Sequence, residues 1–131
     1  MSRNIKIITE THFLLDQSSE AQSNYVWSYD ITIENHSDEI IQLLNRAWKI
    51  TDMRGQVDEI KGPGVIGLQP IIKPHKSFSY SSFCQLNTPQ GSMEGTYEMQ
   101  NLDDEVFEVL VPKFLLQTPQ GKTHPLRSLL H

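Results

Sequence analysis

A glycine-rich stretch carries the clearest chemical motif of this sequence. Three glycines in it fit the pattern G-x-G-x-x-G, and three lysines flank it: Gly62, Gly64, Gly67, Lys61, Lys73 and Lys76. Backbone N–H groups that glycine leaves unshielded can form an anion-binding nest, and the lysines would be the natural charge partners of a phosphate or nucleotide held there. The alternative is a tight crossing between two strands, in which the glycines serve the backbone alone.

The dinucleotide-binding form of this motif is excluded by the residues that follow it. That form needs a strand before the glycines and a helix directly after them. Pro70 and Pro74 occupy the segment where the helix would run, and a proline does not fit a helix interior. The motif is therefore either a phosphate-binding loop of another kind or a structural turn.

Two further residues have types that could do chemistry. Arg46 lies in an otherwise apolar run, where an arginine is usually paired or reaches solvent, although it could also contact a phosphate or a carboxylate. Cys84 has no histidine close to it in sequence, so we expect a packing residue and not an activated nucleophile. With no paired acid and base in the sequence, we predict no catalytic residue.

Metal-ligating residue types are scattered. The histidines have no metal-ligand spacing, and they are His12, His36, His75, His124 and His131. Residues 103–105 are predicted to be a solvated acidic turn, which together with residues 58–59 could at most make a weak site for a divalent ion. We therefore predict no metal ligands and no cofactor.

The elements that must position these residues are predicted to be strands. Residues 25–35 alternate most clearly, with large apolar side chains on one face and polar ones on the other, which is typical of an antiparallel strand with one buried face. Residues 40–51 change their apolar phase partway, as one inserted β-bulge residue would do, and a helix over residues 39–49 is the competing interpretation. The other strand-like runs are 5–13, 56–60, 69–74, 77–82, 93–99 and 107–111.

The pattern of short strands and frequent turns predicts an all-β fold. The best fit is an antiparallel β-sandwich of about seven strands, immunoglobulin-like or fibronectin type III-like, with a small Greek-key barrel as the alternative. Pro112 either ends the last strand or marks a sheet edge. We expect one domain over residues 1–116, followed by a C-terminal tail over residues 117–131.

Charge and cysteine content limit the partners and the compartment. The chain has 131 residues and a formal net charge of −5 at pH 7, which argues against non-specific binding to nucleic acid or to an anionic membrane. No segment approaches the roughly 20 apolar residues that a membrane span needs. Cys84 is the only cysteine and no run resembles a signal peptide, so we expect a cytoplasmic protein.

Several unrelated motifs occur in an order that resembles the bacterial ApaG family. The resemblance covers about residues 5–116 and rests on these segments: Tyr25-Val26-Trp27-Ser28-Tyr29, Leu43-Leu44-Asn45-Arg46-Ala47-Trp48, Gly62-Pro63-Gly64-Val65-Ile66-Gly67, Gly91-Ser92-Met93-Glu94-Gly95-Thr96-Tyr97 and Phe107-Glu108-Val109-Leu110-Val111-Pro112. It implies a fibronectin type III-like sandwich in a stand-alone cytosolic protein, and a link to cobalt resistance and magnesium efflux. It also implies a role in protein interaction, because related domains in eukaryotic proteins serve as interaction modules.

Two classes of function follow from these observations. The first is a non-enzymatic binding module, whose ligand is a partner protein or a phosphate or nucleotide held at the glycine-rich loop; its exposed edge strands could also pair two copies into a homodimer. The alternative is a hydrolase or phosphotransferase acting on nucleotides. The resemblance suggests diadenosine polyphosphates as its substrates, because the family takes its name from a genetic neighbour that hydrolyses them.

Overall fold

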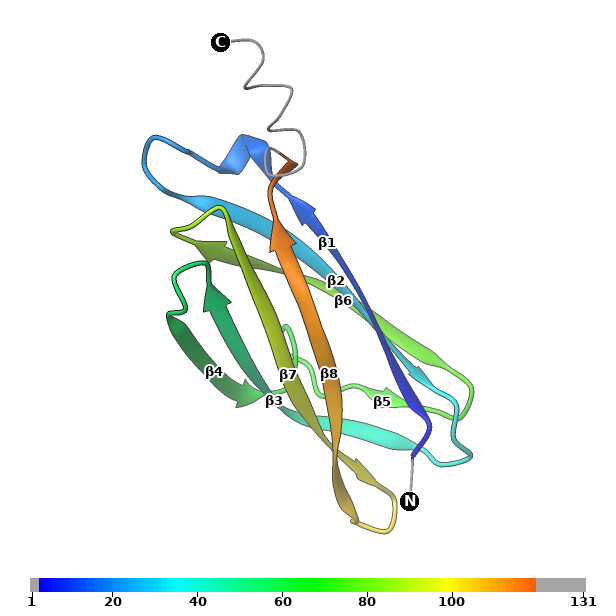
Figure 1. Ribbon diagram of the computed structural model, residues 1–131. Coiled ribbons are helices and arrows are strands. Elements are labelled where there is room, and N and C mark those ends of the chain that lie inside the picture. Colours follow the sequence, from blue (N-terminus) through cyan, green and yellow to red (C-terminus); the bar gives the residue numbers. More distant parts are fainter. Residues whose placement is uncertain (1–2, 120–131) are drawn as a thin grey trace.

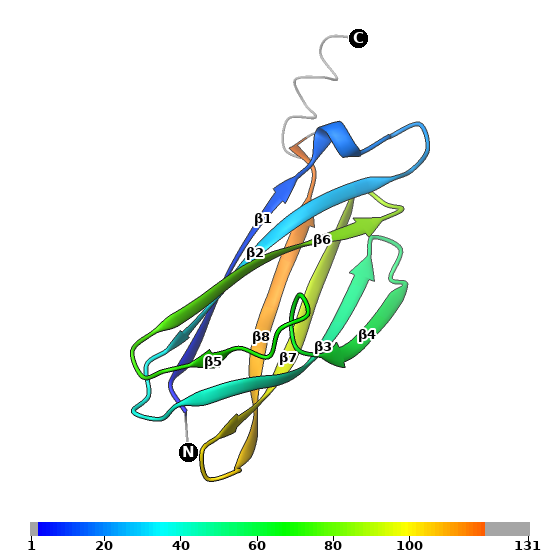
Figure 2. The ribbon, with the colours of Figure 1, turned by 180° about the vertical axis from the view of Figure 1, so that it is seen from behind.

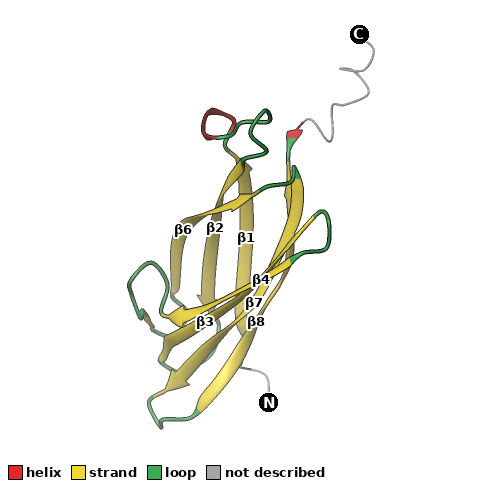
Figure 3. Ribbon diagram, turned by 90° about the vertical axis from the view of Figure 1, so that its left-hand side faces the viewer, coloured by secondary structure: helices red, strands yellow, loops and turns green. Residues whose placement is uncertain are grey.

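Two antiparallel sheets pack face to face and bury one core between them (Figures 1 and 3). The structure, a computed structural model, describes residues 3–119. The first sheet has the order β1-β2-β6, with β1 (Ile5–Phe13), β2 (Tyr25–Asn35) and β6 (Ser77–Leu86). The second has the order β4-β3-β7-β8, with β3 (Ile41–Asp52), β4 (Val57–Pro63), β7 (Gln90–Asn101) and β8 (Val106–Gln117), and the short β5 (Ile71–Ile72) pairs with β3. The predicted all-β antiparallel sandwich is thus confirmed, with seven longer strands and one short one.

The alternating pattern of β2 produces the centre of the core, as predicted. Trp27, Ile31 and Ile33 have no exposed surface, because successive side chains of a strand point to opposite faces and these three point toward the second sheet. Tyr29 packs edge to face on Trp48 of β3, with 5.8 Å between the ring centres. The two sheets are therefore joined by aromatic contacts in addition to general apolar burial.

The β-bulge expected in the third strand is present at Leu44. The pairing of β3 with β7 shifts by one residue between Leu43 and Asn45, so Leu44 has no partner on β7. Its carbonyl oxygen instead accepts hydrogen bonds from Gly64 N (2.8 Å) and from Gln69 Nε2 (2.9 Å). The bulge thus holds the glycine-rich segment against the sheet, and the competing helix over residues 39–49 is wrong.

Pro112 marks a sheet edge and does not end its strand. It lies within β8, which is the outer strand of the second sheet. The pairing with β7 shifts at this point, where Pro112 and Lys113 lie between the pairs Met93↔Phe114 and Gly95↔Val111. An edge position and a bulge are the two places where a sheet tolerates the missing N–H group of proline.

Three predicted boundaries are corrected. Gln117 is the last residue of β8 and Thr118 is buried, so the predicted tail cannot begin at residue 117; residues 120–131 of that tail lie outside the described residues. Of the predicted strand over residues 69–74, only Ile71–Ile72 pairs. Gly62 is a residue of β4 and not of the loop that follows it, because the ladder with β3 continues to Pro63.

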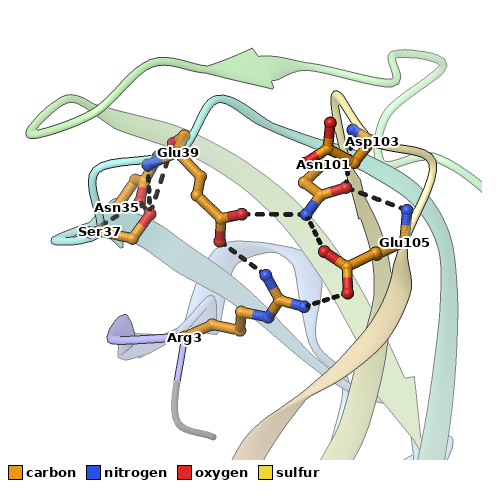
Figure 4. Close-up of polar contacts among 7 residues, drawn as sticks. All are labelled: Arg3, Asn35, Ser37, Glu39, Asn101, Asp103 and Glu105. Carbon is orange, nitrogen blue, oxygen red and sulfur yellow. Dashed lines mark hydrogen bonds and ion pairs between the residues drawn. The ribbon is translucent and has the colours of Figure 1, made fainter.

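A polar network ties the start of the chain to two turns at one end of the sandwich (Figure 4). Asn101 Nδ2 donates to Glu39 Oε1 (2.9 Å) and to Glu105 Oε1 (2.8 Å), while its Oδ1 accepts two backbone N–H groups of the turn between β7 and β8. Arg3 donates to Glu39 Oε2 (2.6 Å) and pairs with Glu105 (3.6 Å). The β2–β3 turn, the β7–β8 turn and the segment before β1 are therefore held together by side chains.

Candidate functional site

The glycine-rich loop is a two-residue hairpin turn closed by its own backbone. Val65 N donates to Leu68 O (2.8 Å) and Leu68 N donates to Val65 O (2.9 Å). The two residues between them, Ile66 and Gly67, both have positive φ angles, of 45° and 78°, as the tight turns that match the twist of a hairpin require. Val65 is buried and anchors the turn to the core.

Gly64 is required at its position by space as well as by backbone angle. Its φ is +61°, and a Cβ atom there would lie 2.1 Å from the carbonyl oxygen of Leu68. Real Cβ atoms do not approach an oxygen so closely, so any side chain would force the turn apart. This glycine serves the crossing between β4 and the hairpin turn.

Arg46 fastens the same segment from the neighbouring strand. It pairs directly with Gly62 across the ladder, and its Nη1 donates to the carbonyl oxygens of Pro63 and Gly64, at 3.0 Å each. A Cβ atom on Gly62 would lie 3.1 Å from that Nη1, so the missing side chain makes room for the guanidinium. The hydrogen bonds of Arg46 with other described residues use Nη1 alone, which leaves Nε and Nη2 as available donors.

Three amides of the glycine-rich loop form hydrogen bonds within the protein and are not available to the ligand that the phosphate hypothesis expects. The N–H groups of Gly64, Val65 and Leu68 all donate to backbone carbonyl oxygens, so they are not directed to a ligand. A nest needs successive N–H groups that point into one concavity. The structural interpretation of the motif, a tight crossing between strands, accounts for these hydrogen bonds.

The predicted charge partners are only partly brought together. Lys61 lies on β4 beside Gly62 and pairs across the ladder with the residue after Arg46. Lys73 and Lys76 belong instead to the turn between β5 and β6, where Lys76 O accepts from the backbone of Asn35 (2.9 Å). In Figure 2 this turn lies at the left of the molecule, away from the glycine-rich loop.

A cleft opens beside the loop, between the edge strands β4 and β6. Its volume is about 420 Å³, within the range of pockets that bind small ligands or side chains. Its floor is made of core residues, including Tyr29, Trp48 and Met93, and the loop residues Ile66 and Gly67 contribute to its wall. The rim carries exposed apolar side chains: Ile60, Ile66 and Phe83. On this side the sandwich leaves part of its core accessible.

Burial keeps the tyrosine hydroxyl groups and the thiol group of the cleft protonated at physiological pH. The hydroxyl groups of Tyr80 and Tyr97, on opposite sheets, lie 2.6 Å apart in a hydrogen bond, and burial raises the pKa of both. Burial also raises the pKa of the Cys84 thiol to about 11, with a smaller contribution from Asp58. Cys84 is therefore a protonated packing residue, as expected from the sequence, and not a thiolate.

Comparison with known proteins decides the family. The model of the ApaG domain matches residues 15–101, which include β2 to β7 and so both walls of the cleft. This chain belongs to the ApaG family. It is 50% identical over 119 residues to the ApaG protein of Allorhizobium ampelinum (91% of this chain and 92% of that protein), and 47% identical over 122 residues to that of Parvibaculum lavamentivorans (93% and 94%).

A crystal structure described as the ApaA protein from Bordetella pertussis has the same fold. It superposes with a TM-score of 0.87 at 36% identity, over 89% of this chain and 95% of that one. The resemblance found in the sequence motifs and the predicted sandwich fold are both confirmed by these comparisons. In addition, the described part of this ApaG domain contains no helix that is long and apolar enough to cross a membrane.

A cluster of side chains that could ligate a metal ion was missed in the sequence analysis. Among the described residues, the only group of at least three ligand atoms from His, Cys, Asp or Glu within 4.8 Å of one another is Glu10, His12 and Asp30. Asp30 reaches the other two because β2 pairs with β1, which spacing along the chain does not reveal. The one available signal was the placement of Glu10 and His12 two residues apart in a predicted strand, hence on one face.

The other histidines form simpler pairs or lie outside the described residues. His36 contacts Glu34 (2.9 Å) and His75 contacts Asp38 (3.5 Å), while His124 and His131 are not among the described residues. The acidic turn at residues 103–105 donates backbone N–H groups to Asn101. It does not gather with residues 58–59 into a ligand cluster, within the part of the chain that the structure describes.

Proposed function

We propose that this ApaG-family chain is a non-enzymatic binding module that captures an extended segment of a partner protein in the cleft between β4 and β6. The observation that carries the proposal is the open side of the sandwich. There, buried aromatic residues form a floor and exposed apolar side chains form the rim. Phe83 on β6 is 65% exposed and Ile60 on β4 is 44% exposed, and both line the cleft. Apolar side chains gathered around a concave site favour an interaction surface.

An extended segment fits because both walls of the cleft are sheet edges. β4 ends the second sheet and β6 ends the first, so each has one side without a neighbouring strand. Extended peptides bind such edges by adding a strand, and alternate side chains then enter adjacent pockets. The cleft supplies a pocket of that kind next to the edge.

Arg46 indicates the chemistry of the captured segment. Its Nη1 is engaged by the loop, while Nε and Nη2 keep donor capacity in a guanidinium that lines the cleft. Arginine binds carboxylates through paired N–H groups. The preferred segment therefore places a large apolar side chain over Trp48 and a carboxylate close to Arg46.

This proposal replaces the loop phosphate site with the neighbouring cleft. The amides of Gly64, Val65 and Leu68 are already engaged, which weighs against phosphate or nucleotide binding at the loop. The link to cobalt resistance and magnesium efflux remains an expectation from the resemblance, and under this proposal it would act through the partner protein. The free edges could also pair two copies into a homodimer, which light scattering at several concentrations tests.

The test uses a photo-crosslinking amino acid in place of Phe83, with Leu110 as the matched control. Leu110 is 69% exposed on β8, at the other edge of the second sheet. In extract of the native cell, we expect the Phe83 position to yield a discrete crosslinked protein, and Ile60→Asp to reduce that yield at least fivefold. The Leu110 position should yield no such protein. Equal crosslinking from both positions, or a yield insensitive to Ile60→Asp, contradicts the proposal.

Purified protein distinguishes the alternatives. A rise in melting temperature with pyrophosphate or ATP would favour a phosphate ligand. The same measurement on Gly67→Ala, whose added Cβ meets nothing within 4 Å, tests whether the loop is the place where the ligand binds. Gly64→Val is unsuitable because it would disrupt the turn. Turnover of diadenosine polyphosphate by the pure protein would favour the hydrolase alternative.

A further inference from the structure

We propose that Glu10, His12 and Asp30 bind a divalent transition-metal ion on the outer face of the first sheet. The proposal is independent of the cleft, since none of these residues lines it. One imidazole nitrogen with two carboxylate oxygens is a donor set that suits Zn²⁺ or Ni²⁺ better than the hard ions Mg²⁺ and Ca²⁺, which take oxygen ligands almost exclusively.

Strand pairing brings the three ligand side chains together. Glu10 of β1 lies directly opposite Asp30 of β2 in the antiparallel ladder, and His12 follows on the same face of β1, since side chains two residues apart share a face. His12 Nε2 lies 2.9 Å from Glu10 Oε1 and 3.1 Å from Asp30 Oδ2. The three ligand atoms all lie within 4.8 Å of one another.

These separations are close to those of a coordination shell. Bonds of about 2.1 Å to one ion place neighbouring ligand atoms about 3.0 Å apart in octahedral and about 3.4 Å apart in tetrahedral geometry. Nε2 is already at this distance from both carboxylate oxygens. Small side-chain rotations would therefore admit an ion between them, with the Nε2 lone pair directed to it.

The local charges are unbalanced in a way that a cation corrects. Carboxylates directly opposite each other on neighbouring strands repel, and His12 is the only basic side chain that pairs with either of them among residues 3–119. Farther along the same strands, Lys6 lies opposite Glu34, so there the ladder itself supplies the opposite charge. A divalent ion would do the same for Glu10 and Asp30.

One ligand is held by an outer partner. Ser81 of β6, which lies opposite Asp30 on the other side of β2, donates its hydroxyl to Asp30 Oδ1. This leaves Oδ2 facing His12. Hydrogen bonds of this kind orient carboxylate ligands in established metal sites. The remaining coordination positions would be filled by water, because all three ligand side chains are about half exposed or more.

His36, the first residue after β2, supplies a matched control. Like His12 it lies 2.9 Å from a carboxylate, that of Glu34, and its side chain is equally exposed, at 48%. It differs in lacking a second carboxylate among the described residues. His12→Ala and His36→Ala thus each remove one exposed histidine that contacts carboxylate, but only the first removes the proposed site.

The experiment titrates the full, untagged chain with Zn²⁺ and with Ni²⁺ by calorimetry, and follows the histidine ring resonances by NMR. We expect saturable binding that shifts the His12 ring signals, an affinity at least tenfold weaker in His12→Ala and in Asp30→Asn, and a change of less than twofold in His36→Ala. Mg²⁺ should not compete at equal concentration.

Three results would overturn the proposal. One is the absence of saturable binding, which would mean that the cluster is an ion-paired surface and nothing more. Another is binding that survives His12→Ala, which would place the ion at other histidines of the chain. The third is an equal loss of affinity in His36→Ala. Unchanged melting temperatures of the metal-free variants establish that these exposed substitutions leave the fold intact.

Discussion

At the scale of single residues, the glycine motif shows how one sequence pattern can serve two unrelated purposes. Gly64 sits where a phosphate-binding loop would have an exposed amide, yet its N–H donates to the bulged residue Leu44. The sequence could not distinguish these uses, because Leu44 becomes the hydrogen-bond partner of Gly64 only when the folded strands bring them together. Arg46 likewise contacts backbone carbonyl oxygens, those of Pro63 and Gly64, which become its neighbours only when β3 and β4 pair.

Substitutions of the loop glycines should distinguish the cost of a steric collision from the cost of a positive φ angle. Gly64→Ala should lower the free energy of unfolding by about 2–4 kcal/mol, because strain at positive φ adds to a collision with Leu68 O. Gly67→Ala, also at positive φ but with open space around it, should cost only about 1–2 kcal/mol. Urea denaturation of both variants measures the difference, and equal costs would show that the collision is relieved by movement of the turn.

The Cys84 thiol should react slowly despite its place in the cleft. Burial raises its pKa to about 11, so at pH 7.5 almost all of it is the unreactive protonated form. Labelling with a thiol-specific disulfide reagent should be at least tenfold slower than for the protein in denaturant, and it should accelerate as the pH approaches 11. A rate at pH 7.5 equal to that of the denatured chain would contradict this assignment.

At the scale of elements, the predictions were best where one pattern ran over many residues. The alternation of β2 predicted its bounds, Tyr25–Asn35, and the phase change in β3 predicted the bulge. The strand predicted over the proline-rich residues 69–74 was too long, because proline specifies an extended backbone without specifying a partner strand. The cluster around His12 was missed for a related reason: its third member depends on the register of two strands.

Trp27 connects two elements, β2 and the end of β8, whose contact could not be predicted from the residue pattern. Its Nε1 donates to Gln117 O (2.9 Å) at the end of β8, so the first sheet holds the last strand. Trp27→Phe should destabilise the fold by about 1–3 kcal/mol, because it leaves this acceptor without its donor and removes buried surface. Hydrogen exchange should also accelerate more near Leu116 than at Ile33. Uniform acceleration would contradict a local role in holding β8.

At the scale of the whole molecule, the network of Figure 4 makes stability depend on pH. The hydrogen bond from Arg3, followed by that from Asn101, lowers the pKa of Glu39 below its ordinary value of 4.5. A carboxylate with a lowered folded-state pKa stabilises the fold above its unfolded-state pKa, and this contribution disappears as the pH falls through the folded-state value.

Glu39→Gln should therefore melt at a lower temperature than the unmodified protein at pH 7. The difference should shrink below about pH 4.5 and vanish in stronger acid. Glu59→Gln is the control, since Glu59 on the exposed strand β4 forms no ion pair within residues 3–119. Melting curves between pH 2 and 8 measure both, and a Glu39→Gln difference that is constant with pH would rule out this origin.

The order of the strands also has a consequence for synthesis of the chain. In each sheet an inner strand pairs with a strand that comes much later in the chain: β2 pairs with β6, and β3 pairs with β7. A nascent chain released from the ribosome only as far as residue 70 therefore carries two hairpins, β1–β2 and β3–β4, whose shared core still lacks the buried side chains of β6 and β7, such as Tyr80 and Tyr97. Protease resistance should appear only after β7 has emerged, so ribosome-stalled chains ending shortly before Gln90 should be the most dependent on chaperones.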